Sequence, residues 1–182
     1  MKRSHNGILV LVIAASVWVF DAGAQSGVCE LGGGSKLDIN IEIPDRGKVI
    51  FNNGIGYSSD GISSKDWEHE IKDNLIIKQG NNGYRLIIIE SKHITGSGLW
   101  GNILIYKCHN NINTVIYSKS FLGGIIVTVG KGGELLLRSR EWGVGDPECC
   151  PSKERISVIK INSKDEVEQI QSELIQRQKE GA

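Results

Sequence analysis

The chain has few of the features that would narrow its function. Its 182 residues include only three prolines, one methionine and four cysteines, and 21 basic residues balance 21 acidic ones. A protein without a basic excess has no net positive charge with which to displace the counterions of a polyanion, so we expect no nucleic acid among its partners. Beyond the N-terminus no apolar run approaches the about 20 residues of a membrane-spanning helix, so we expect no transmembrane segment in the mature chain.

Motifs of catalysis are also scarce. Residues 96–101, GSGLWG, match the dinucleotide-binding pattern G-x-G-x-x-G, but that pattern requires a following helix, and a run typical of a strand follows instead. The same stretch lacks the spacing of a G-x-S-x-G nucleophile elbow, and the zinc signature H-E-x-x-H is absent. The sequence therefore predicts neither a cofactor nor a metal, and we interpret these glycines as places where the chain turns or bulges.

The N-terminus has the three parts of a secretory signal peptide. Lys2 and Arg3 give a basic start, residues 8–20 are almost continuously apolar, and residues 22–24, AGA, fit an A-x-A cleavage site. The apolar run is too short to span a membrane. We therefore predict that residues 1–24 are removed, and that the mature protein is soluble and either secreted or periplasmic.

All four cysteines lie beyond the predicted signal peptide, at Cys29, Cys108, Cys149 and Cys150. An even number of cysteines in an oxidising compartment favours disulfides. A bond between the neighbours Cys149 and Cys150 would close a small strained ring. We therefore predict that each neighbour is bonded to one of the two distant cysteines. The alternative joins Cys29 to Cys108 and the doublet to itself. Zinc binding by Cys108, His109 and the doublet is a third interpretation, which the ligand spacing does not favour.

Most of the mature chain has the pattern of strands. From Leu37 to Ile43 apolar and polar residues alternate strictly, which is typical of a half-buried strand. Other apolar stretches are separated by turns rich in glycine and asparagine; they lie at 48–51, 75–78, 84–90, 102–108, 112–121, 125–129, 134–142 and 156–161. We predict an all-β domain over residues 25–162, an antiparallel sandwich or barrel of about nine strands, braced by disulfides.

Two segments have a different pattern. Residues 163–182 carry apolar residues at helical spacing, and Ser163 with Glu166 fits a capping box, so we predict a C-terminal helix there. Residues 63–75 fit a helix or a strand. In the strand interpretation one face would be shared by Trp67, His69 and Ile71.

Two stretches with a histidine are candidates for chemistry. Asp66, His69 and Glu70 lie close together and could bind a metal or exchange protons, although an exposed charged loop explains them as well. His93 lies near Ser97 and could activate its hydroxyl as a nucleophile. The sequence places no third group that would orient this histidine. These residues define an alternative function, a small envelope hydrolase.

The cysteine doublet lies in a stretch that resembles a known family. Residues 146–152, DPECCPS, precede the last strand predicted for the β domain. They are similar to the CCP-Ser/Thr stretch near the C-terminus of the LppP/LprE type of exported bacterial lipoproteins, and the similarity covers residues 142–161. The resemblance implies export and a disulfide-braced β module, and it implies no reaction. Because Cys29 lies several residues past the apolar run, we expect no lipid anchor.

These observations favour an exported, non-catalytic β module that binds another molecule, as an inhibitor, an immunity-type protein or an envelope accessory protein. The expected partner is a protein or a cell-envelope component. Aromatic side chains in loops provide large contact areas at low entropic cost. The candidate contact residues, each of which could instead be ordinary core, are Tyr57, Trp67, His93, Trp100 and Trp142.

Overall fold

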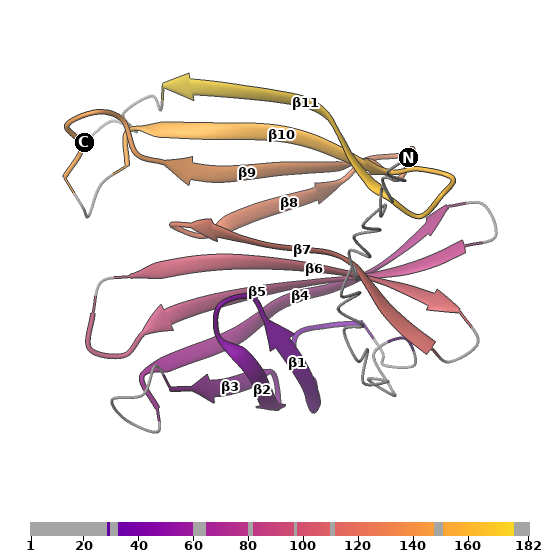
Figure 1. Cartoon of the computed structure of the whole chain (residues 1–182), viewed down its shortest axis with the longest axis horizontal. Coiled ribbons are helices and arrows are strands. Elements are labelled where there is room, and N and C mark those ends of the chain that lie inside the picture. The colour runs from indigo at the N-terminus through magenta and orange to yellow at the C-terminus, as the bar shows by residue number, and fades with distance from the viewer. Residues whose placement is uncertain are drawn as a thin grey trace, which may run out of the picture.

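The computed structural model describes residues 29, 33–59, 65–79, 82–96, 98–109, 112–147 and 151–176. These residues form eleven strands and no helix (Figure 1). The strands are β1 (Ile39–Ile43), β2 (Gly47–Asn52), β3 (Ile55–Ser58), β4 (Trp67–Gln79), β5 (Asn82–His93), β6 (Leu99–His109), β7 (Ile112–Leu122), β8 (Ile125–Val129), β9 (Leu135–Glu141), β10 (Lys153–Ile161) and β11 (Val167–Gln176). The all-β prediction is confirmed. The predicted signal peptide at 1–24, Ser97 and the doublet at 149–150 lie outside the described residues.

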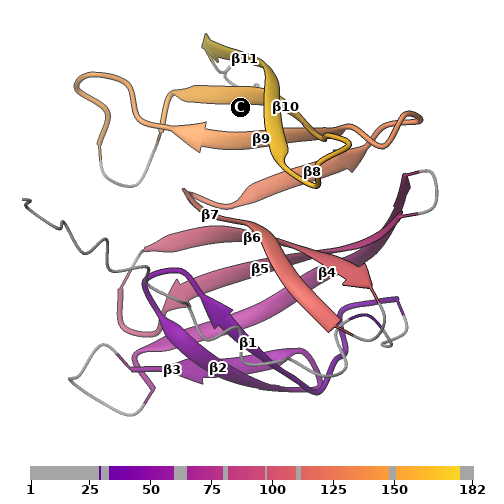
Figure 2. The same ribbon diagram turned by 45° about the vertical axis from the view of Figure 1, so that its right-hand side comes forward.

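The strands form two antiparallel sheets. The first has seven strands in the order β1-β2-β3-β4-β5-β6-β7, and the second has four in the order β11-β10-β9-β8. Strands that are neighbours in a sheet are also neighbours in the chain, so short turns connect them. Figures 1 and 2 show the four-stranded sheet stacked on one side of the larger sheet, while β1 and β2 curl over its other side.

Strand β5 is buried on both faces, which explains its continuous apolar run. Leu86 and Ile88 face one way and belong to an apolar cluster that includes residues of β9 and β10 in the second sheet. Ile87 and Ile89 face the other way and belong to a cluster that includes residues of β1 and β2. A strand covered on both sides has no polar face, so its sequence does not alternate.

From Trp67 onward, the segment with two interpretations is a strand. Trp67, His69 and Ile71 of β4 are all buried and lie on one face, as the strand interpretation requires. The register with β5 then shifts after Ile71, and the next buried side chain is Asn74. The extra residue at this bulge changes which residues of β4 face the core.

The prediction of a C-terminal helix is wrong, because β11 pairs antiparallel with β10 over this segment. A tight turn precedes β11. The N–H of Asn162 donates to the carbonyl of Glu166 at 2.8 Å, and the Oδ1 of Asn162 accepts from the N–H of Lys164 at 2.8 Å. Asp165 has a φ of 66°. A left-handed residue at the end of such a turn is common in hairpins, and it sends the chain back along β10.

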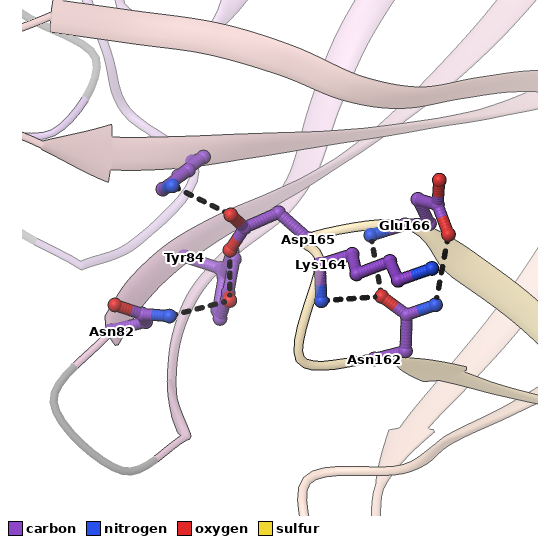
Figure 3. A network of polar contacts seen from close by, with 7 residues as sticks. Asn82, Tyr84, Asn162, Lys164, Asp165 and Glu166 are labelled. Carbon is purple, nitrogen blue, oxygen red and sulfur yellow. Dashed lines mark hydrogen bonds and ion pairs between the residues drawn. The ribbon is translucent and has the colours of Figure 1, made fainter.

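The carboxylate of Asp165 fixes this turn to the seven-stranded sheet (Figure 3). It accepts hydrogen bonds from the Nζ of Lys107 on β6 at 2.6 Å and from the hydroxyl of Tyr84 on β5 at 2.7 Å. The bonds from Lys107 and then Tyr84 hold the pKa of Asp165 below its ordinary value, because they favour the charged carboxylate. The contact joins the two sheets at one end of the molecule.

Gly101, the last glycine of GSGLWG, allows the chain to cross between the sheets. A Cβ at this position would lie 2.6 Å from the side chain of Ile125 and 2.7 Å from its backbone nitrogen. Only glycine permits β8 to begin so close to β6. Strand β6 begins within the motif, at Leu99, so Gly101 is a strand residue that serves packing. The described residues around it include no helix N-terminus that could hold a phosphate.

One disulfide joins Cys29 to Cys108, whose Cα atoms are 5.7 Å apart. The prediction that these two cysteines bond the Cys149–Cys150 doublet is therefore wrong, and the alternative pairing is the one observed for them. The prediction was based on the strain of a bond between neighbouring cysteines. The sequence does not show that Cys29 lies close to Cys108 in the folded chain. That path brings Cys29 beside β6, where its carbonyl accepts from the buried Arg85 of β5 at 3.4 Å.

Candidate binding site

Three aromatic residues meet at one end of the seven-stranded sheet. Trp67 begins β4, His93 ends β5 and Trp100 lies at the start of β6. The centroid of the Trp67 ring is 5.0 Å from that of His93 and 4.9 Å from that of Trp100, with interplanar angles of 88° and 74°. These are edge-to-face contacts. Trp67 is buried, whereas His93 and Trp100 are half-buried, so the group has an accessible side.

The turn between β1 and β2 places a cation on these rings. The N–H of Arg46 donates to the carbonyl of Ile43 at 3.1 Å, Pro44 is the second residue of the turn, and Asp45 is the third with a φ of 61°. This is the geometry of a type II turn. The guanidinium carbon of Arg46 lies 3.7 Å from the centroid of Trp67. We call Arg46, Trp67, His93 and Trp100 the aromatic–arginine cluster.

A chain of hydrogen-bonded side chains crosses five strands beside this cluster. His69 on β4 contacts Ser58 of β3 through Nε2 at 2.8 Å and Ser91 of β5 through Nδ1 at 2.7 Å. Asn102 of β6 donates to Ser91 at 2.8 Å and accepts from Ser120 of β7 at 2.8 Å. Because a slip of register would leave the buried members of this row unpaired, the row fixes the strand alignment beside the cluster.

The surroundings keep His69 neutral. Its side chain is fully buried. Burial, and to a smaller extent the charge of Arg46, lower the pKa of His69 to about 4. Ser91 accepts from Asn102, so its own proton is available to Nδ1 of His69, and Nε2 of His69 then donates to Ser58. In this assignment both ring nitrogens have partners.

The contact between Ser58 and His69 resembles a nucleophile and its base, but its chemistry is unfavourable. A general base works best when its pKa lies near the working pH, and the pKa of His69 is about 4. The ring has no accessible surface. Since Nε2 donates to Ser58 in the assignment above, it is not available to accept the serine proton. We interpret the pair as a structural contact.

The structure separates the proposed metal ligands. His69 faces the buried side of β4 with its ring between two serines, whereas Glu70 faces the opposite side and pairs with Lys72 at 2.5 Å. Asp66 lies before the strand and accepts from Ser59 at 3.1 Å. Within the described ranges, no three residues among histidine, cysteine, aspartate and glutamate are placed to hold a metal ion.

The other predicted residues lie apart from the cluster or outside the description. Tyr57 is on the opposite face of the sheet, 40% exposed, with its hydroxyl 3.4 Å from Glu68. Trp142 follows β9 in the second sheet and takes part in none of the described ring contacts. The Nδ1 of His93 accepts from the backbone N–H of Thr95 at 3.3 Å. Its predicted partner Ser97 lies outside the described residues.

Sequence reasoning missed two parts of this region. Arg46 was not singled out, although the stretch IPDRG at 43–47 has the residues of a rigid turn that presents its next side chain. The serines and Asn102 were missed because single polar residues in a strand pattern normally face solvent. Here they lie in one buried row, which only the pairing of five strands reveals.

A groove of about 880 Å³ lies where the two sheets diverge near the β7–β8 turn. Its walls include Leu99, Ile126 and Arg140, and also Glu154, which forms a forked ion pair with Arg138. The groove contains no aromatic residue and mixes both charge signs, so it defines a ligand less well than the cluster does.

No family model, curated protein or solved structure matches the chain. The described residues form no helix that is long and apolar enough to cross a membrane.

Proposed function

We propose that the protein is an exported, non-catalytic β module that binds another secreted or cell-envelope protein, as an inhibitor, an immunity-type protein or an accessory protein. Export is supported by the pattern of residues 1–24 and by the resemblance of residues 146–152 to the LppP/LprE type of lipoproteins. The contact surface that we assign is the aromatic–arginine cluster.

The observation that carries this proposal is the convergence of Arg46, Trp67, His93 and Trp100 at one end of the sheet. Tryptophan and arginine are enriched among the residues that contribute most to protein interfaces. The turn that positions Arg46 and the hydrogen-bonded row beside the rings support a cluster that is largely preformed before binding. A rigid surface loses little conformational entropy when a partner docks.

The surroundings of His69 support a non-catalytic role for this histidine. The pKa of about 4 and the complete burial of His69 suit a structural contact with its serine partners. The half-buried His93 also has a hydroxyl partner, since the Oγ1 of Thr95 lies 3.2 Å from its Nδ1. The alternative hydrolase, which uses His93 with Ser97, stays a prediction. It requires activity that is lost when Ser97→Ala is made in a folded protein.

The test is capture of a partner from the envelope extract of the source cells by immobilised mature protein. Trp100→Ala removes a half-buried ring of the cluster, and Trp100→Phe keeps a smaller ring in case the alanine variant is poorly folded. Leu174→Ala is the matched control, since Leu174 is 43% exposed on β11 in the other sheet. Thermal unfolding checks each variant. Capture that depends on Trp100 and not on Leu174 supports the proposal.

A further inference from the structure

One face of the Arg46 guanidinium stacks on a tryptophan ring, and the N–H groups at its edge are available to bind an anion. It stacks 3.7 Å from the centroid of Trp67 and 5.6 Å from that of Trp100. The N–H groups of a guanidinium lie around its edge, in a fork that matches a carboxylate. The hydrogen bond formed by this side chain is a 3.4 Å contact from Nη1 to the backbone carbonyl of Asp45, in an exposed position.

Arg46 differs in this respect from Arg138 on β9 and Arg155 on β10. Arg138 and Arg155 each form a forked ion pair with a glutamate. None of the ion pairs in the described parts of the chain involves Arg46. The charge of Arg46 acts on the buried His69, because it contributes to the lowered pKa of that histidine. No carboxylate is among the causes of this shift.

From this geometry we infer that Arg46 receives a carboxylate of the protein partner, with the Trp100 and His93 rings beside the bound group. The inference rests on the proposed function and names the chemistry that the cluster recognises. A single arginine supplies one positive charge, which suits a carboxylate better than a phosphate dianion. The type II turn positions the backbone of Arg46, and stacking on Trp67 positions its guanidinium before the ligand arrives, so less entropy is lost on binding.

The carboxylate can be the C-terminus of the partner or an aspartate or glutamate side chain, and small peptides distinguish the two. The mature protein, labelled with ¹⁵N, is titrated with three probes. One is an acetylated tripeptide of small residues with a free C-terminal carboxylate, the second is the same tripeptide as its amide, and the third is an amidated tripeptide with one glutamate. The Nε–H signal of Arg46 and the indole N–H signal of Trp100 report binding.

We expect saturable shifts with at least one acidic probe and none with the uncharged amide. A response to the first probe alone identifies a chain terminus, and a response to the third identifies an acidic side chain. Arg46→Ala should weaken binding about tenfold or more, since hydrogen bonds to charged groups are the stronger ones. Arg46→Lys keeps the charge without the fork and should bind with intermediate affinity. Arg140→Ala, which removes the same charge from β9, should have no effect.

Equal shifts with the amide, full affinity in a folded Arg46→Ala variant, or no response to either acid would each overturn the inference. The spectrum of each variant shows whether it is folded, and Arg46→Lys provides the test if the alanine variant is not. The capture experiment stays independent. If capture depends on Trp100 but no acidic peptide binds, the inference that Arg46 binds a carboxylate is refuted and the proposed function stands. If acidic peptides bind at Arg46 but the Trp100→Ala variant captures the partner as well as the wild type does, the proposed function fails.

Discussion

Acid should destabilise the protein through His69. The pKa of an ordinary histidine in an unfolded chain is about 6.5, whereas that of the buried His69 is about 4. Below the higher value the unfolded chain binds a proton that the folded protein does not, so the free energy of unfolding falls as the pH falls. The difference between the two pKa values corresponds to a loss of about 3 kcal/mol by about pH 4, and the loss saturates below that pH.

The assay is urea unfolding of the wild-type protein and of His69→Gln near neutral pH and near pH 4. Glutamine keeps a donor and an acceptor but does not titrate, and the carboxylates of both proteins titrate alike. The wild type should lose about 3 kcal/mol more than the variant over this interval. Equal losses would refute the reasoning. An NMR titration of the wild-type His69 ring gives a second reading, and a pKa of 6.5 or higher would contradict a buried neutral histidine.

Two further predictions concern the connections of the fold. Peptide mapping of the non-reduced protein should link Cys29 to Cys108, and Cys29→Ser should lower the free energy of unfolding by about 2–4 kcal/mol; a peptide that links Cys29 to the doublet would contradict the structure. Gly101→Ala should cost about 1–3 kcal/mol by overpacking, because its Cβ would lie 2.6 Å from a side chain of β8. Gly83→Ala meets no atom within 4 Å and is the control; similar melting temperatures for the two variants would count against the close crossing of β8 over β6.

The sequence predicts the strand class well because burial follows the alternation of side chains. The strict alternation of residues 37–43 corresponds to β1, in which Ile41 and Ile43 are buried and the residues between are not. The run at 84–90 corresponds to β5, which is covered on both faces. The structure adds two strands to the prediction, β3 and β11, and extends the one predicted at 75–78 back to Trp67 as β4. The added parts are short, mostly exposed or ambiguous in period.

The C-terminal segment shows why periodicity can mislead. Its apolar residues fit a helical stripe, yet Ile170 and Leu174 are 60% and 43% exposed in β11, so no buried surface selects a helix. The turn at Asn162–Glu166 and the open edge of β10 decide the structure instead. Pairing with a distant or neighbouring strand overrides weak local preference, and a local pattern does not contain that information.

The candidate site was only partly predictable for a related reason. The tryptophans and His93 attract attention individually, and the structure brings Trp67, His93 and Trp100 together while leaving Tyr57 and Trp142 elsewhere. Their meeting depends on the register of β4, β5 and β6. The position of Arg46 over the Trp67 ring depends on how β1 and β2 curl over the sheet (Figure 2), and the sequence of no single segment specifies that curl.

The most direct test of the central claim is quantitative partner capture by the folded Trp100→Ala and Leu174→Ala variants. Loss of a central tryptophan from an interface typically costs 2 kcal/mol or more, which corresponds to about a thirtyfold loss of affinity. The account predicts such a loss for Trp100→Ala and capture at the wild-type level for Leu174→Ala. Undiminished capture by a folded Trp100→Ala variant would contradict the assignment of the aromatic–arginine cluster as the binding surface.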